Sequence, residues 1–193
     1  MSIQSVAAER KRASRRAIVR SASRHLRRHG PARASLKAIT ADVGLTVGGL
    51  YNHFGSKAEL LASGFRQGAL ERRGLIARAL RGKRGFERLT AWLTTYLTAK
   101  HRENVIDGCL IAATLGDVSR GETELQDAVA EEIEVSLDAI AGWIAPEDPQ
   151  AAYTTAVRTM ALAIGTLQLA RATARKPELS DAILAAGKQG VPQ

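Results

Sequence analysis

The stretch Leu36–Leu61, LKAITADVGLTVGGLYNHFGSKAELL, decides the fold of this chain. Ser35 and Thr46 each stand before a short run of apolar residues at helical spacing, where a hydroxyl oxygen can accept from the free N–H groups of a first helical turn. Gly44 and Gly55 follow the two runs and end them. The pattern therefore predicts two short helices, over residues 36–43 and 47–54.

Two short helices joined by a glycine turn are typical of a helix-turn-helix, in which the second helix enters the major groove of DNA and the first crosses the backbone. One set of apolar residues has the spacing to pack the two helices together: Leu36, Ile39, Val43, Leu50 and Phe54. The other residues of the second helix are left for solvent or DNA: Val47, Gly48, Gly49, Tyr51, Asn52 and His53.

The adjacent Gly48 and Gly49 lower the stability of the second helix by about 2 kcal/mol relative to alanine. A helix this short is already marginal, so the pair needs a reason. Close approach of the helix N-terminus to a phosphate or a base edge would supply one. A plain transition from loop to helix is the alternative.

The other segments also show helical periods, and no stretch shows the alternation of a β-strand, so the fold class is all-α. A first helix ends at Gly30-Pro31. Ser56 and Glu59 form a Ser-x-x-Glu capping box that starts a longer helix, which is followed by a flexible joint over residues 82–85. The helices predicted outside the opening stretch cover residues 8–29, 57–80, 86–101, 109–118, 122–144, 150–175 and 178–188.

Positive charge is concentrated in the first half of the chain. Residues 1–85 contain 19 Lys and Arg against 4 Asp and Glu, a balance of +15. Residues 86–193 contain 9 against 15, a balance of −6. A basic front half suggests that only this half meets a polyanion such as DNA. Solvated helix faces are the alternative for a run of charge.

Several classes of protein find no support in the sequence. No apolar run approaches the roughly 18 residues of a membrane span, and the N-terminal residues do not form a secretion signal. The single Cys109 cannot form an intrachain disulfide, which suits a reducing cytoplasm. We predict no enzyme, cofactor or metal, because no phosphate loop, zinc-spaced Cys/His set or Gly-x-Ser-x-Gly is present. Two groups of titratable residues are expected on solvated helix faces: His25 and His29, and Glu131, Glu132 and Glu134.

The opening stretch resembles the signature of the TetR family of bacterial regulators. The likeness is carried by the turn Gly-Leu-Thr, by Leu-Tyr-Asn-His-Phe and by Ser-Lys-Ala-Glu-Leu-Leu, and the preceding RHLRRHG fits the family's first helix. Together these segments cover about residues 15–62. The later stretch GCLIAATLGDVSRG resembles one branch of the family more weakly.

The resemblance implies a role for individual residues at the DNA. Those that would hold phosphates are Thr46, Tyr51, His53 and Lys57. Those at base-facing positions are Val47, Gly48, Gly49 and Asn52. Ser35 is included in the DNA-facing set, and Lys37 would contact a base or a phosphate. Because two base-facing positions lack a side chain, we expect Lys37, Asn52 and DNA shape to read the sequence. The arginines of Arg10–Arg16 would reach the minor groove as an arm or form a disordered tail.

The resemblance also implies a helical domain over residues 63–193 that binds a small-molecule effector and forms a homodimer, joined to a DNA-binding domain over residues 1–62. The candidate pocket residues are aromatic or apolar with a few polar groups: Trp92, Tyr96, His101, Cys109, Leu110, Thr114 and Trp143. The last two long helices carry more apolar surface than a monomer needs, which predicts a dimer interface at Leu137, Ile140, Val157, Met160, Ile164 and Leu167.

The predicted function is that of a cytoplasmic repressor that leaves a pseudo-palindromic operator when a small apolar or aromatic effector binds. Three alternatives stay open. The protein could activate transcription, it could sense oxidants or electrophiles through Cys109, or it could bind DNA without any effector. Cys109 itself has a plainer interpretation as a small buried hydrophobe.

Overall fold

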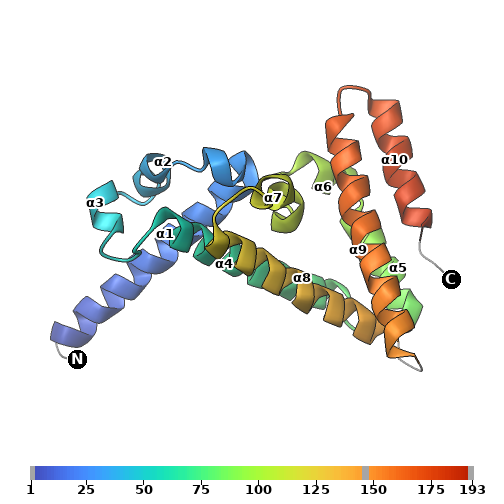
Figure 1. Ribbon diagram of the computed structural model, residues 1–193, viewed down its shortest axis with the longest axis horizontal. Helices are drawn as coiled ribbons and strands as arrows, with labels where there is room; N and C mark the ends of the chain where they lie inside the picture. Colours follow the sequence, from blue (N-terminus) through green and yellow to red (C-terminus); the bar gives the residue numbers. More distant parts are fainter. Residues whose placement is uncertain (1–2, 145–147, 191–193) are drawn as a thin grey trace.

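The computed structural model describes residues 3–144 and 148–190, which form ten helices and no strand (Figure 1). The all-α prediction is confirmed for this part of the chain. The helices are α1 (Ile3–Arg33), α2 (Leu36–Ala41), α3 (Val47–Leu50), α4 (Lys57–Ala79), α5 (Gly85–Tyr96), α6 (Ala99–Glu103), α7 (Leu110–Val118), α8 (Thr123–Trp143), α9 (Pro149–Ala172) and α10 (Pro177–Gln189).

The first helix ends where Gly30-Pro31 predicted. Gly30 has φ of 71° and ψ of 171°, so the regular helix stops there, and only a short turn continues to Arg33. A Cβ at this position would lie 2.5 Å from Oδ2 of Asp117 at the end of α7. The start of α1 differs from the prediction. Residues Arg10–Arg16 lie within the helix, so the disordered-tail alternative for them is wrong.

The helix-turn-helix is anchored by the apolar residues that the sequence assigned to it. Ile39, Leu50 and Phe54 are buried, and Leu36 and Val43 pack against the same core at partial exposure. Phe54 is also covered by Arg15 of α1, whose guanidinium carbon lies 4.5 Å from the ring centroid. α1 and α4 therefore form the support on which α2 and α3 lie, at one end of the molecule (Figure 1).

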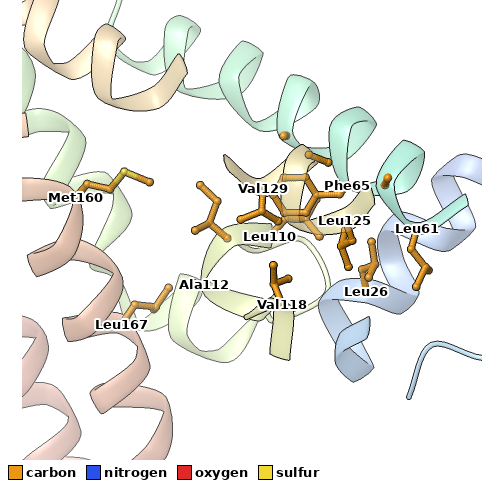
Figure 2. Close-up of a cluster of buried hydrophobic side chains, with 14 of the residues drawn as sticks. Leu26, Leu61, Phe65, Leu110, Ala112, Val118, Leu125, Val129, Met160 and Leu167 are labelled. Atoms are coloured by element: carbon orange, nitrogen blue, oxygen red, sulfur yellow. The ribbon is translucent and has the colours of Figure 1, made fainter. Parts of the chain in front are cut away.

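The short helix α7 joins this head to the body. Figure 2 shows its Leu110 gathered with Phe65 of α4 and with Leu125 and Val129 of α8, and Leu26 of α1 lies beside them. All five side chains are at most 3 % exposed. A single hydrophobic core thus runs from the head into the body, with α7 packed against α1, α4, α8 and α9.

The segment predicted as one helix over residues 86–101 is two helices. α5 ends at Tyr96, and Thr98 begins α6 by accepting from the backbone N–H of His101 at 3.1 Å. The prediction of one helix was wrong because a threonine that caps a new helix is compatible with a continuing apolar period. The break turns His101 back toward α5, which matters for the cavity described below.

The body ends in α8, α9 and α10. α9 packs on α8 along one side and on α10 along another. α9 and α10 lie at the end of the molecule opposite to α2 and α3 (Figure 1). Residues 145–147 lie outside the described residues.

Candidate DNA-binding face and effector cavity

Two hydroxyl groups begin the helices of the head. Thr46 Oγ1 accepts from the backbone N–H of Gly49 at 3.0 Å, and Ser35 Oγ accepts from that of Ala38 at 3.4 Å. Both predicted N-caps are confirmed, although α3 proper is only four residues long. The chain continues as a turn over residues 51–53, because Leu50 O already accepts from His53 and Phe54.

The capping box at the start of α4 is also present. The backbone N–H of Glu59 donates to Ser56 Oγ at 2.9 Å. The Glu59 carboxylate accepts from the backbone N–H of Gly55 at 2.7 Å, one residue before the cap. These two bonds fix the direction in which Lys57, the first residue of α4, leaves the turn after α3.

The residues predicted to contact DNA lie on consecutive elements at the α2 and α3 end of the molecule (Figure 1). Tyr51 is 52 % exposed. The exposed members of the set are Ser35, Lys37, Thr46, Gly48, Tyr51 and Asn52. The half-buried members are Val47, Gly49, His53 and Lys57. The exposed and half-buried residues between Thr46 and Lys57 therefore form the candidate DNA-binding surface, with Ser35 and Lys37 at the start of the neighbouring α2.

Packing within the chain does not require glycine at Gly48. A Cβ at Gly48 would meet only Thr46 Oγ1, at 3.8 Å, and one at Gly49 would meet the same atom at 3.4 Å. Both are ordinary contacts, and neither residue has a positive φ. The two glycines therefore lower the stability of α3 without a packing reason inside the chain. Close approach of α3 to an external partner would supply such a reason.

One ring nitrogen of His53 faces the interior of the protein. Its Nδ1 is buried and has no hydrogen-bond partner in the described part of the chain. Only the remainder of the half-buried ring is available for a phosphate.

A cavity of about 60 Å³ lies in the body among α4, α5, α7, α8 and α9. Four of the predicted pocket residues line it: Trp92, Tyr96, Cys109 and Leu110. A second cavity of about 230 Å³ adjoins it and is lined by Trp92 and Trp143. The two share five wall residues: Arg73, Ile76, Trp92, Ser136 and Ile140.

Two predicted pocket residues are absent from both cavity walls. Thr114 is fully buried and donates to Leu110 O at 2.8 Å, which keeps its hydroxyl within α7. His101 lies behind Tyr96, with its ring edge-on to the phenol at 4.6 Å between centroids. These two positions were wrong because the direction of a side chain from a helix depends on packing that a single sequence does not reveal.

His101 is held by two backbone groups. Nδ1 lies 2.7 Å from Tyr96 O, and Nε2 accepts from the backbone N–H of Cys109 at 3.1 Å. These partners require a proton on Nδ1 and none on Nε2, which is the neutral tautomer. Burial lowers the pKa of His101 to about 4. The residue thus joins the end of α5 to the start of α7.

The cavity wall also contains polar residues that were not predicted to line it: Arg72 and Arg73 of α4 and Glu132 and Ser136 of α8. Arg73 forms an ion pair with Glu132, to which Ser136 Oγ also donates at 3.3 Å. The prediction that Glu132 belongs to a solvated face was wrong, since it is 9 % exposed and burial raises the pKa of its carboxyl. Its partner comes from α4, so no local sequence signal marks it.

Of the other titratable residues expected on solvated helix faces, three are exposed and one is half-buried. Glu131 is exposed and pairs with Arg66 at 2.9 Å, and Glu134 is exposed. His25 is half-buried and bonds to Asp42 of the head at 3.2 Å, whereas His29 is exposed. The hydrogen bond from Ser21 and that with His25 lower the pKa of Asp42.

Arg27 connects the head to the cavity. It is 9 % exposed and donates through Nε to Gly108 O at 3.0 Å, through Nη1 to Ser23 Oγ at 3.1 Å and through Nη2 to Gly68 O at 3.4 Å. One side chain of α1 therefore bonds to α4 and to the loop that leads into Cys109. Burial lowers its pKa, and nothing in the sequence distinguishes it from its neighbouring arginines.

The predicted dimer residues are mostly internal to the chain. Leu137, Ile140, Met160 and Leu167 are at most 7 % exposed, and Ile140 and Met160 line the first cavity together with the half-buried Ile164. These positions were wrong as a free interface, because the apolar periods of α8 and α9 are used to pack the helices on each other. Val157 differs, since it is 41 % exposed.

Within residues 3–144 and 148–190, no helix has the length and apolar content needed to cross a membrane. The same residues contain no group of three or more His, Cys, Asp or Glu side chains placed to hold a metal ion.

Comparisons with known proteins agree with this geometry. Residues 18–63 match the family model described as bacterial regulatory proteins, tetR family. No curated protein matches the chain. A TetR transcriptional regulator from Chloroflexus aurantiacus is similar in structure, with a TM-score of 0.75, 24 % identity, and coverage of 95 % of this chain and 94 % of that one. Escherichia coli NemR in its reduced form has a TM-score of 0.75, 16 % identity, and coverage of 93 % and 98 %.

Proposed function

Because this chain belongs to the TetR family of DNA-binding transcriptional regulators, we propose that it is a repressor that leaves its operator when a small apolar or aromatic effector fills the cavity of the body. The observation that carries the DNA-binding half is the surface of exposed and half-buried residues between Thr46 and Lys57, in which Gly48 and Gly49 have no internal reason to be glycine. A balance of +15 over residues 1–85 supports attraction to the phosphate backbone.

The DNA-binding domain is proposed to cover residues 1–62 and the effector and dimer domain residues 63–193. α4 crosses this boundary as one continuous helix, from Lys57 to Ala79, with its first residue at the DNA and Arg72 and Arg73 at the cavity. Expansion of the cavity would therefore tilt the head. Effector and operator must each favour a different state, with a reciprocal coupling of typically 1–3 kcal/mol.

Selection from a randomised duplex library tests the DNA-binding half. We expect an enriched site of two symmetric half-sites about one helical turn apart, or a multiple of it. Lys57→Ala should weaken binding about equally on all sequences, whereas Asn52→Ala should alter preference at one position by about 1–3 kcal/mol. Arg175→Ala, at an exposed residue after α9, is the control and should change neither. The reverse pattern for Lys57 and Asn52 would contradict their assigned roles.

A homodimer is proposed to form through the outer face of α9. Tyr153 and Val157 are each 41 % exposed, and Ala161 follows Val157 by one helical turn. Small and apolar residues on one helix face allow a second copy to approach closely. Light scattering should give twice the chain mass for the parent and a monomer for Val157→Glu. A monomeric parent protein would remove the two-half-site proposal.

Sensing through Cys109 is the second candidate, because the half-buried thiol lies on the cavity wall with Tyr96. Hydrogen peroxide would convert the thiolate to a sulfenic acid with release of hydroxide. Peroxide should then release the parent protein from DNA and leave Cys109→Ser bound. Equal release of both would exclude this route.

A DNA-binding protein without an effector is the third candidate. It would bind all sequences with a similar dependence on salt and would protect no discrete site in a footprint. We expect no catalytic activity of any of these forms.

A further inference from the structure

We propose that the cavity takes a small aromatic or branched aliphatic carboxylic acid, whose carboxylate accepts from Tyr96 Oη and Arg72 Nε. This inference rests on the proposed effector role of the cavity and specifies its ligand class. Two unpartnered donors on one wall carry it.

Tyr96 Oη and Arg72 Nε are both buried, and neither has a hydrogen-bond partner in the described residues. Tyr96 is 3 % exposed, so its hydroxyl is shielded from bulk solvent. Its hydroxyl lies beside the Cys109 thiol without a hydrogen bond of good geometry, and sulfur is a weak acceptor in any case. Buried donors without partners are rare in native proteins and indicate that something else supplies the acceptor.

The two donors belong to residues that lie against each other on one cavity wall. The guanidinium carbon of Arg72 lies 5.9 Å from the centroid of the Tyr96 ring, and both residues line the cavity of about 60 Å³. Arg72 Nε can only donate, and the Tyr96 hydroxyl, which could accept from it, has no hydrogen-bond partner either, so the hydrogens of both groups are left without an acceptor. A carboxylate offers two acceptor oxygens and matches a phenol and a guanidinium together.

Charge around the cavity favours an anion. No ion pair joins Arg72 to a carboxylate of the described residues. Arg171 and Arg27 lie nearby and donate to backbone carbonyls, and burial lowers the pKa of each. The carboxylate on the cavity wall, Glu132, is already held by Arg73 and Ser136. An acid bound at Arg72 would therefore supply a missing negative charge.

The rest of the ligand must be apolar. Beyond the donors, the wall consists mainly of Ile76, Trp92, Leu110, Ile140 and Met160. The adjoining cavity of about 230 Å³ continues past Trp92 to Trp143. A flat ring or a branched chain can extend into this second space while its carboxylate stays at Tyr96. An apolar pocket with a few fixed polar groups is the usual form of a small-molecule site.

The chain provides its own reporter for this site. Its two tryptophans are Trp92 and Trp143, and both line the cavities. Fluorescence titration of the full chain, without DNA, therefore measures binding directly. The probes are benzoate, phenylacetate, 3-phenylpropionate and 4-methylpentanoate, each beside its neutral primary amide.

We expect at least one acid to quench tryptophan emission with saturation and its amide to bind at least 10-fold more weakly. Tyr96→Phe and Arg72→Gln should each weaken the acid at least 5-fold and leave the amide within 2-fold. Arg78→Gln, at an exposed residue of α4, is the matched control and should leave both within 2-fold. Circular dichroism and a denaturation midpoint establish that each variant is folded.

Equal affinity for acid and amide, equal loss in the control variant, or no saturable signal from any of the four acids would overturn the proposal. Release from DNA is measured separately. If acids bind without releasing the operator, the ligand class stands and the repressor mechanism fails. If neutral compounds release the operator while acids do not bind, the repressor mechanism stands and the ligand class fails.

Discussion

Gly68 lies where α1, α4 and α7 meet, and its replacement by alanine tests whether this junction is as tightly packed as the structure shows. A Cβ at Gly68 would lie 2.5 Å from Leu110 Cδ1 and 2.7 Å from Arg27 Nη2, and closer still to Ser23 Oγ. All three are side chains of buried residues, from both α1 and α7. Gly74, two turns further along the same helix, offers a matched control because a Cβ there would meet nothing within 4 Å.

Both substitutions improve helix propensity, but only Gly68→Ala also overpacks the junction. Alanine improves helix stability over glycine by about 1 kcal/mol at either position. At Gly68, overpacking costs about 1–3 kcal/mol, and Arg27 must also give up its bond to Gly68 O. We therefore expect a net loss of about 1–2 kcal/mol for Gly68→Ala and a gain of up to about 1 kcal/mol for Gly74→Ala.

Thermal unfolding at one fixed protein concentration measures both, since association would otherwise shift the midpoint. For a chain of this length about 1 kcal/mol corresponds to about 2–4 °C in Tm. Gly68→Ala should melt about 2–8 °C below the parent, and Gly74→Ala up to about 4 °C above it. A Gly68→Ala protein that gains as much as Gly74→Ala would refute the close contact of α1, α4 and α7.

Two further predictions concern the cavity and the head. The pKa of His101 is about 4 in the folded protein and has its ordinary value of 6.5 in the unfolded chain. Between these two values the unfolded state binds more protons, so the free energy of unfolding falls as the pH drops through this window. Chemical denaturation measures the free energy of unfolding at pH 7.5 and at pH 5. Between these two values the parent should lose about 2 kcal/mol more than His101→Gln, which retains the contributions of Asp42 and Glu132. Equal losses in the two proteins would contradict the buried neutral imidazole. Thr46→Ala removes the cap of α3 and should cost about 1 kcal/mol in the same assay, whereas Thr90→Ala, exposed on α5, should stay within about 0.5 kcal/mol.

The head was predictable because its signals are local. A capping hydroxyl acts on an N–H group two or three residues away, so Ser35, Thr46 and Ser56 mark three helix starts in a single sequence. Apolar residues three or four apart place Ile39 and Phe54 in a core without knowledge of the partner helix. The all-α class follows from the same short-range patterns.

The cavity was less predictable because its polar groups depend on long-range packing. Glu132 looks like one member of an acidic helix face until Arg73 of α4 is placed against it. Met160 and Leu167 have the apolar spacing of an interface and of a core alike, and only the position of α10 and α8 decides between them. The spacing of apolar residues along a sequence shows that one face of a helix is buried. It does not show which neighbouring element covers that face.

The buried arginine of α1 gives a physical route between the two halves. Arg27 bonds to Gly108 O, directly before Cys109, whose own N–H donates to His101. His101 in turn bonds to Tyr96 O, and the Tyr96 hydroxyl is one of the two unpartnered donors of the cavity. A ligand that draws Tyr96 or Arg72 inward would move the start of α7, and with it the helix that supports α2 and α3. Because Arg27 of α1 bonds to this loop and to α4, a small shift of the loop must be absorbed by α1 or α4, and both of these helices carry the proposed DNA-binding face.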